Sequence, residues 1–277
     1  YNHLELRKDL EESHISGRER IKWRGHSDTE TLLAGFETWG IEDTLNKTIG
    51  MFAIALWDSK KSMLYLIRDR FGEKPLYYGW VGSGEDRAFI FGSELKALSI
   101  FPGFDNQVCR QALGQYMRYA YVPAPRSIYK NIYKLEAGSI LTINGSECFS
   151  APSRPLRPSE SHGSLSLKTW WSLSDVVKNS QLNKISNEND AINSLEKSLS
   201  DSVRLQSLAD VPLGAFLSGG VDSSAIVALM QEQTSRPVKT FTVGFEDSDY
   251  DERIIIVIRL MVILFSIIAI IIIICCC

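Results

Sequence analysis

The sequence predicts an α/β protein whose first half is rich in antiparallel sheet and whose second half opens a doubly wound parallel sheet. Three observations indicate this class. Apolar runs of strand length alternate with turn residues before residue 150, helical spacing of apolar residues begins near residue 187, and a strand–loop–helix–strand pattern follows at residues 211–245. Hydrophobic residues make up 44% of the chain and charged residues 23%, which is typical of a globular protein.

The first half contains several strand and turn patterns. The nearly continuous apolar run GMFAIALWD at residues 50–58 predicts a strand buried on both faces. The turn SKKS separates it from MLYLIR at residues 63–68, which predicts a hairpin. Two further antiparallel pairs are predicted: residues 76–80 with 88–92, and residues 138–143 with 147–149 across Asn144-Gly145.

Residues 151–186 predict a linker, because their first part (APSRPLRPSESHGSLSL) is rich in proline, serine and arginine and poor in apolar residues. After it, Asn187 is placed to cap a helix whose apolar residues recur at helical spacing. We therefore expect one domain at residues 1–150 and the start of a second at residues 187–253.

The last segment, residues 254–277, is an apolar run interrupted by Arg259 and Ser266. It approaches the ~20 apolar residues that span a bilayer, which leaves a membrane anchor open. Its isoleucine tract, three terminal cysteines and lack of positive charge behind it favour an artefact of a truncated or frame-shifted reading. The net charge of −3 gives no reason to expect nucleic acid as a partner.

The segment SGGVDSS at residues 218–224 carries the most chemical information. Gly219 and Gly220 allow a sharp turn and close approach to a ligand, and the amides at the start of the next helix favour an anion. Asp222 would repel phosphate unless Mg²⁺ bridges the two. The loop is not a Walker A loop, because no Gly-Lys-Ser/Thr follows at the required spacing. The alternative is a turn that merely caps a helix.

VPLGAFLSGGVDSS followed by TFTVGF resembles the pyrophosphate loop of asparagine synthetases and their ATP-pyrophosphatase relatives. The resemblance implies an adenine nucleotide α-hydrolase-like domain, with ATP and Mg²⁺ as cofactors and Asp222 as the metal-binding residue. Val243 is implied to lie against adenine. The implied ATP contacts of the loop are Leu217, Ser218, Gly219, Gly220, Val221, Asp222, Ser223 and Ser224.

The first half resembles the class II glutamine amidotransferase domain of bacterial asparagine synthetases. The resemblance rests on GHSDTE at residues 25–30, RDRFGEKPLYYG at 68–79, FGSELKAL at 91–98 and YVPAPRSIYKNIYKLEAGS at 121–139. It implies an N-terminal-nucleophile αββα sandwich and a glutamine-binding role for Asp28, whose alternative role is a helix N-cap. Arg68, Asp69 and Arg70 are either neighbours of the active site or a structural turn.

The family's N-terminal cysteine nucleophile and its oxyanion-hole residues have no counterpart, and neither Cys109 nor Cys148 is placed for that role. We therefore expect no catalytic residue, a chain truncated at both ends, and no glutamine hydrolysis or asparagine formation by the chain as it stands.

The parent protein implied by the resemblance is a cytoplasmic, ATP-dependent ligase that forms asparagine from aspartate and glutamine-derived ammonia through an aspartyl-adenylate. Its small-molecule partners would be glutamine, aspartate and ATP, with a homodimer as a further expectation. The open alternatives are a β-lactam synthetase or lasso-peptide cyclase on the same scaffold, and a non-catalytic, membrane-tethered nucleotide-binding protein.

Overall fold

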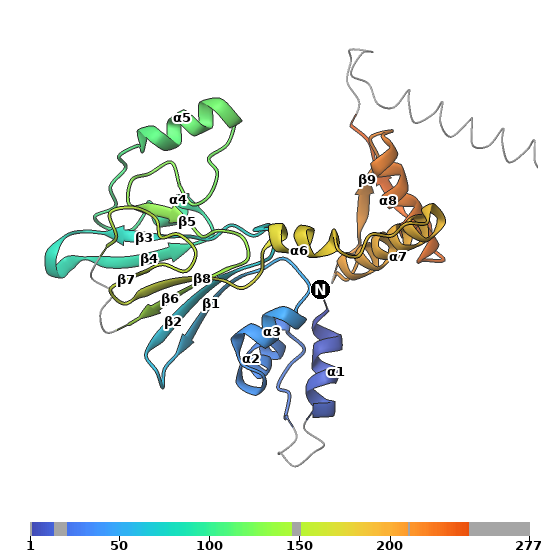
Figure 1. The fold of residues 1–277 in the computed structure, drawn as a ribbon, viewed down its shortest axis with the longest axis horizontal. Coiled ribbons are helices and arrows are strands. Elements are labelled where there is room, and N and C mark those ends of the chain that lie inside the picture. The colour runs from blue at the N-terminus through green and yellow to red at the C-terminus, as the bar shows by residue number, and fades with distance from the viewer. Residues whose placement is uncertain (1, 14–20, 146–150, 210, 244–277) are drawn as a thin grey trace, which may run out of the picture. The chain divides into compact units, whose positions relative to one another are not determined.

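A computed structural model describes residues 2–13, 21–145, 151–209 and 211–243 of the chain (Figure 1). The chain divides into two compact units, and each is described by itself. The first unit comprises Asn2–Asn183, and the second begins at Lys184.

The first unit contains six helices and eight strands among its described residues, together with a short 3-10 turn at Gly84–Asp86. Its helices are α1 (His3–Ser13), α2 (Asp28–Thr38), α3 (Ile41–Lys47), α4 (Leu95–Leu98), α5 (Arg110–Tyr119) and α6 (Leu173–Ser180). Its strands are β1 (Ala53–Asp58), β2 (Met63–Arg68), β3 (Tyr77–Val81), β4 (Ala88–Gly92), β5 (Ile132–Lys134), β6 (Ser139–Asn144), β7 (Ser161–His162) and β8 (Leu165–Thr169).

These strands form two antiparallel sheets. One has five strands in the order β1-β2-β6-β8-β7, and the other has three in the order β4-β3-β5. Helices α2 and α3 lie on one side of the five-stranded sheet, and the three-stranded sheet lies on its other side (Figure 1). With α4 beyond the smaller sheet, the unit has the layered αββα arrangement that the resemblance implies.

Alternation along the strands explains these layers, since successive side chains of a strand point to opposite faces. In β2, Leu66 packs in the core between the two sheets, whereas Ile67 packs against Leu45 of α3. In β3, Tyr78 belongs to the core between the sheets, whereas Val81 packs with Leu98 of α4. Each sheet is therefore covered on both faces.

The predicted linker at residues 151–186 is wrong for its first part. Strand β8 pairs with β6 over five residues, and β7 pairs with β8, so this segment supplies two strands of the larger sheet. Leu156, Leu165 and Leu167 are buried in the core between the sheets. The composition hides this role, because two leucines at alternate positions are enough when a neighbouring strand satisfies the backbone hydrogen bonds.

The strand predicted at residues 50–58 forms, but it is covered on both faces only at its start. Ala53 packs on the core between the sheets and Ile54 packs on the helix side. Trp57, near its end, is 53% exposed. The reason is that β1 is an edge strand, paired with β2 alone. The partner strand predicted at residues 147–149 lies outside the described residues.

The second unit contains α7 (Glu188–Gln206), β9 (Gly214–Phe216), α8 (Val221–Glu232) and β10 (Lys239–Phe241). Asn187 caps α7 as predicted, since its side chain accepts a hydrogen bond from Asp190 N. Strands β9 and β10 run parallel with α8 between them, so the predicted βαβ unit is confirmed. Gln233 Nε2 donates to Ser200 O at 2.8 Å and ties the end of α8 to α7.

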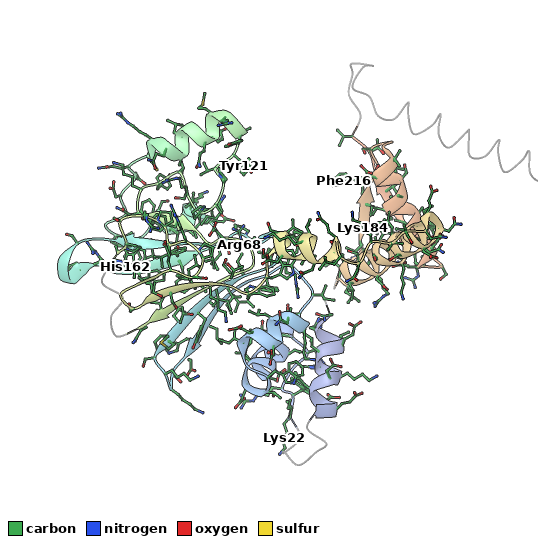
Figure 2. All side chains as sticks on the ribbon, viewed as in Figure 1. Lys22, Arg68, Tyr121, His162, Lys184 and Phe216 are labelled. Carbon is green, nitrogen blue, oxygen red and sulfur yellow. The ribbon has the colours of Figure 1, made fainter. Side chains whose placement is uncertain are left out.

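The strands of this unit are largely exposed. Phe216 of β9 is 76% exposed and Phe241 of β10 is also exposed (Figure 2). The described sheet of this unit has two strands, and all of its residues are exposed except Ala215, which is half-buried. None of the helices in the described ranges is both long and apolar enough to span a bilayer. Residues 244–277, including the apolar segment at 254–277, lie outside those ranges.

Candidate functional site

The glycine-containing loop connects β9 to α8, where parallel strands end. Leu217 N donates to Phe241 O at 2.9 Å, and Thr242 Oγ1 donates to Leu217 O at 2.9 Å. These bonds hold the start of the loop beside the end of β10. Loops that follow the carboxyl ends of parallel strands are the usual ligand-binding positions of such sheets.

Backbone conformation at Gly219 makes the turn possible. Its φ is +72°, in the left-handed region that residues with a Cβ rarely adopt. The next residue, Gly220, has φ −71° and ψ 160° and is the N-cap of α8, without a side-chain capping bond. The turn therefore delivers the chain to the helix with its first amides uncapped.

The three serines of the loop are bonded to one another and to Gly220. Ser218 and Ser223 share a hydroxyl–hydroxyl bond of 3.0 Å, and Ser224 Oγ donates to Gly220 O at 2.7 Å. By contrast, the amides from Gly219 to Ser223 make no hydrogen bond within the part of the chain that is described. A row of free N–H groups at a helix N-terminus is suited to an anion such as a polyphosphate.

Asp222 and Val243 are the other two predicted members of this site. Asp222 lies in the first turn of α8, is exposed and has no ion-pair partner among the described residues. Val243 follows Thr242, whose hydroxyl bonds to Leu217, so the chain brings it next to the loop. The structure thus groups residues 217–224 and Val243 in one place. Their contacts with a nucleotide stay predictions.

Asp28 stands at the other predicted site, at the first position of α2. The alternative prediction that it caps this helix is wrong, because the N-cap is Ser27, whose Oγ accepts from Glu30 N at 3.2 Å. One oxygen of Asp28 accepts from Thr29 N at 2.7 Å. The carboxylate is exposed and has no ion-pair partner in the described ranges, so it is free to receive a cationic group.

Arg68, Asp69 and Arg70 form a structural turn, which decides between the two predicted roles. The Asp69 carboxylate accepts from four backbone amides, those of Phe52, Phe71, Glu73 and Lys74, at 2.9–3.2 Å. Arg68 is buried inside the first unit (Figure 2) and donates to the carbonyls of Gly72, Lys74 and Leu135. Arg70 donates to the carbonyls of Leu45, Asn46 and Thr48 at the end of α3.

Burial lowers the pKa of both arginines. The carboxylate of Asp69 makes no hydrogen bond to either of them, because its oxygens accept from the four amides. A guanidinium that donates to several carbonyls holds a turn in place. Each arginine thus makes three hydrogen bonds to carbonyls of its own unit.

The remaining candidates for a further site in the described residues are the cysteines and clusters of three or more possible metal ligands. Cys109 is partly exposed and is the N-cap of α5, whereas Cys148 lies outside those residues. No group of three or more His, Cys, Asp or Glu side chains that could hold a metal occurs within the described ranges.

Arg7 and Glu30 form a pair beside Asp28 that the sequence does not predict. Glu30 belongs to the GHSDTE segment, and its carboxylate accepts from Arg24 N, Gly25 N and Arg7 Nη2. The spacing of Ser27 and Glu30 is that of a capping box, in which the glutamate reaches back toward the amide of the cap. That signal predicts a carboxylate that binds backbone near Asp28, although not its partner Arg7 in α1.

Comparison with known proteins gives two family matches. A family described as "Glutamine amidotransferase domain" matches residues 1–152, and one described as "Asparagine synthase" matches residues 194–258. The boundary between the matches falls near the boundary between the two units.

Several curated relatives are similar along almost the whole chain. The Bacillus subtilis protein "Asparagine synthetase [glutamine-hydrolyzing] 1" is 34% identical over 91% of this chain and 34% of its own length. A putative asparagine synthetase of Methanocaldococcus jannaschii is also 34% identical, over 91% of this chain and 42% of its own length. The chain thus spans between one third and one half of the length of these two relatives.

A more distant relative, "Amidase chyE" of Penicillium rubens, is 29% identical over 83% of this chain and 32% of its own length. A solved structure of the allosteric regulatory enzyme of purine biosynthesis has 16% identity and a TM-score of 0.38, covering 88% of this chain and 43% of that one. This structural overlap is too small to add to the fold assignment. The amidotransferase match covers more than half of the 277 residues, and the chain therefore belongs to the glutamine amidotransferase domain family.

Proposed function

We propose that this chain is part of a glutamine-hydrolysing asparagine synthetase. In the complete protein, ammonia from glutamine would replace AMP on an aspartyl-adenylate, giving asparagine and AMP, after ATP has activated aspartate with release of pyrophosphate. The observation that carries the proposal is the row of free amides at Gly219–Ser223, placed after β9 in a parallel βαβ unit. The relatives to which this chain is similar are named as asparagine synthetases, which supports the same reaction.

The nucleotide site would be made by residues 217–224 and Val243. The amides of Gly219–Ser223 would donate to phosphate oxygens, and the serine hydroxyls would exchange their mutual bonds for bonds to the same group. Leu217 and Val243 would contribute apolar surface next to adenine. Preorganised donors of this kind stabilise the charge that develops on departing pyrophosphate.

Magnesium fits the donors present at this loop. Asp222 supplies one unpaired carboxylate beside hydroxyl oxygens, with no nitrogen or sulfur ligand nearby in the loop sequence. Mg²⁺ is commonly held by one or two carboxylates together with substrate phosphates and water. When bound, the ion would neutralise phosphate charge. Asp222 would hold the ion.

In the amidotransferase half, Asp28 would bind the α-amino group of glutamine. Its carboxylate is exposed, lacks a cationic partner among the described residues and keeps one oxygen outside the bond to Thr29. Glutamine and aspartate are accordingly the proposed substrates, and the cytoplasm is the proposed location. A homodimer stays a prediction.

Titration of the chain with Mg-AMPPNP, followed by amide NMR shifts, tests the nucleotide site. The proposal expects saturable shifts centred on Gly219–Ser223, and a weaker response without Mg²⁺. The matched control is Glu232→Gln at the opposite end of α8, which should bind like the unsubstituted chain because it lies far from the first turn. Shifts absent from the loop, or spread evenly over the surface, would contradict the proposal.

A further inference from the structure

We propose that Arg7 and Glu30 form a positioning pair that holds the turn presenting Asp28, and thereby set how well the α-amino group of glutamine is bound. The inference rests on the proposed function, in which Asp28 receives that group. Neither residue is proposed to touch substrate. They act through the backbone of residues 24–28.

Glu30 organises this turn from within the same helix as Asp28. Its Oε1 accepts from Arg24 N at 2.6 Å, and its Oε2 accepts from Gly25 N at 3.0 Å. These bonds, the one from Arg24 first, lower the pKa of Glu30 below its ordinary value, and Arg7 adds to the effect. Both oxygens are therefore committed to donors, and the chain just before Ser27 is folded back onto the helix.

Arg7 connects the turn to α1. Its Nη2 donates to Gly25 O at 2.9 Å and to Glu30 Oε2 at 3.2 Å. The guanidinium also lies 4.0 Å from the ring centroid of Trp23, and its side chain is only 12% exposed. Gly25 is thus held at both its amide and its carbonyl by one ion pair.

Helix α1, which carries Arg7, is anchored to the rest of the unit. Asn2 Nδ2 donates to Lys47 O at 2.9 Å, and Asn2 Oδ1 accepts from Ile49 N at 2.8 Å, which ties the start of α1 to the end of α3. Leu6 and Leu10 of this helix are buried. These contacts fix the backbone from which the Arg7 side chain extends.

Asp28 itself has no comparable support. Its one backbone contact is with the adjacent Thr29, and its carboxylate is exposed. Asp28 is the first residue of α2 and directly follows residues 24–27, so a shift of that turn would also move this carboxylate. An error of about 1 Å in the position of a binding group can cost about 100-fold in rate. The pair can therefore affect how Asp28 binds glutamine without contacting the substrate.

Glu30→Gln in the full-length protein that contains this chain tests the inference. The glutamine side chain replaces one acceptor by an NH₂ group, which then faces either Arg24 N or the donors of Gly25 and Arg7. We expect the KM for glutamine to rise about tenfold, a moderate fraction of the loss that misplacement can cause. Ammonia-dependent synthesis should be unchanged.

A second substrate separates positioning from general weakening. Glutaramate (4-carbamoylbutanoate) has the same amide but lacks the α-amino group, so Asp28 has nothing to bind. The inference expects Glu30→Gln to leave hydrolysis of glutaramate within twofold of the unsubstituted protein. The control is Glu12→Gln on α1, because its contact with Lys8 is long, at 4.0 Å, and exposed.

Arg7→Lys provides a variant that keeps the positive charge of α1. Lysine keeps one nitrogen that can donate to Gly25 O or Glu30, but it lacks the planar guanidinium that lies over Trp23, so a smaller rise in the KM for glutamine is expected, again without effect on glutaramate. Equal losses with both substrates in either variant would overturn the inference. If the unsubstituted full-length protein hydrolyses no glutamine, the proposed function itself fails and the inference falls with it.

Discussion

Two polar turns of this chain, one in each unit, use their polar groups in opposite ways. At Arg68-Asp69-Arg70 the side chains bind backbone amides and carbonyls of their own unit. At residues 218–224 the serine side chains bind one another or Gly220 O, and the amides from Gly219 to Ser223 are free within the described chain.

The contrast shows how a charged motif can be assigned without a bound ligand. Asp69 is fully buried and accepts four hydrogen bonds, so nothing of its carboxylate remains for another molecule. Asp222 is exposed and has no ion-pair partner among the described residues. A polar group that its own backbone satisfies stabilises the fold, whereas one left open at a helix N-terminus is available for binding.

The largest expected effect is at the buried turn. Asp69→Ala would leave four backbone amides without their acceptor, at a cost of about 4 kcal/mol in the free energy of unfolding. Urea unfolding of the chain measures this loss. Asp58→Ala is the control, because its carboxylate accepts from Lys60 N and Lys61 N in an exposed turn where water can replace it. A loss below that of the control would show that the turn is not held by Asp69.

Asp222→Ala should produce the converse result. Removal of the metal-binding carboxylate is expected to weaken binding of Mg-AMPPNP about tenfold, or about 1.4 kcal/mol, while the free energy of unfolding changes by less than about 0.5 kcal/mol. Calorimetric titration with and without Mg²⁺ measures the change. Unchanged affinity together with unchanged Mg²⁺ dependence would remove Asp222 from the site.

A pair of glycine substitutions sharpens the assignment of the loop. Gly219→Ala places a Cβ at φ +72°, which costs about 1 kcal/mol and should also weaken nucleotide binding. Gly220→Ala is the matched control, since its φ is −71° and the closest atom to an added Cβ is Ser218 Oγ at 3.5 Å. The melting temperature should therefore fall more in Gly219→Ala than in Gly220→Ala. Equal effects would mean that the left-handed turn is not required.

The smallest effect concerns an exposed ion pair. It tests whether a carboxylate that is hydrogen-bonded but not buried contributes to the stability of the fold. Hydrogen bonds from Arg154 and then Arg157 N lower the pKa of Glu160 to about 2, from an ordinary value of 4.5. Because the folded-state pKa is depressed, this contribution is present above pH 4.5 and is lost as the pH falls toward 2.

Melting temperatures between pH 2 and pH 6 measure this contribution. Glu160→Gln should reduce the pH dependence in that window, with a change smaller than that of Gly219→Ala, because exposed ion pairs contribute little. An unaltered pH profile would mean that other carboxylates account for it.

Sequence alone determined the local features of the molecule. The cap at Asn187, the hairpin of β1 with β2 and the βαβ unit around residues 218–224 each depend on neighbouring residues, so their patterns can be read in a single segment. The glycine loop could be predicted as a candidate site for the same reason, because its turn, its amides and Asp222 lie within seven consecutive residues.

Only the tertiary structure decided the features that depend on distant partners. Strand β8 enters the sheet because β6 lies beside it, and Phe216 is 76% exposed although it belongs to an apolar segment. The turn at Arg68–Arg70 is structural because carbonyls from α3 and from Leu135 reach its arginines. Arg7 meets Glu30 across 23 residues. Burial and pairing are properties of the neighbours that folding brings together, and a segment read by itself does not contain them.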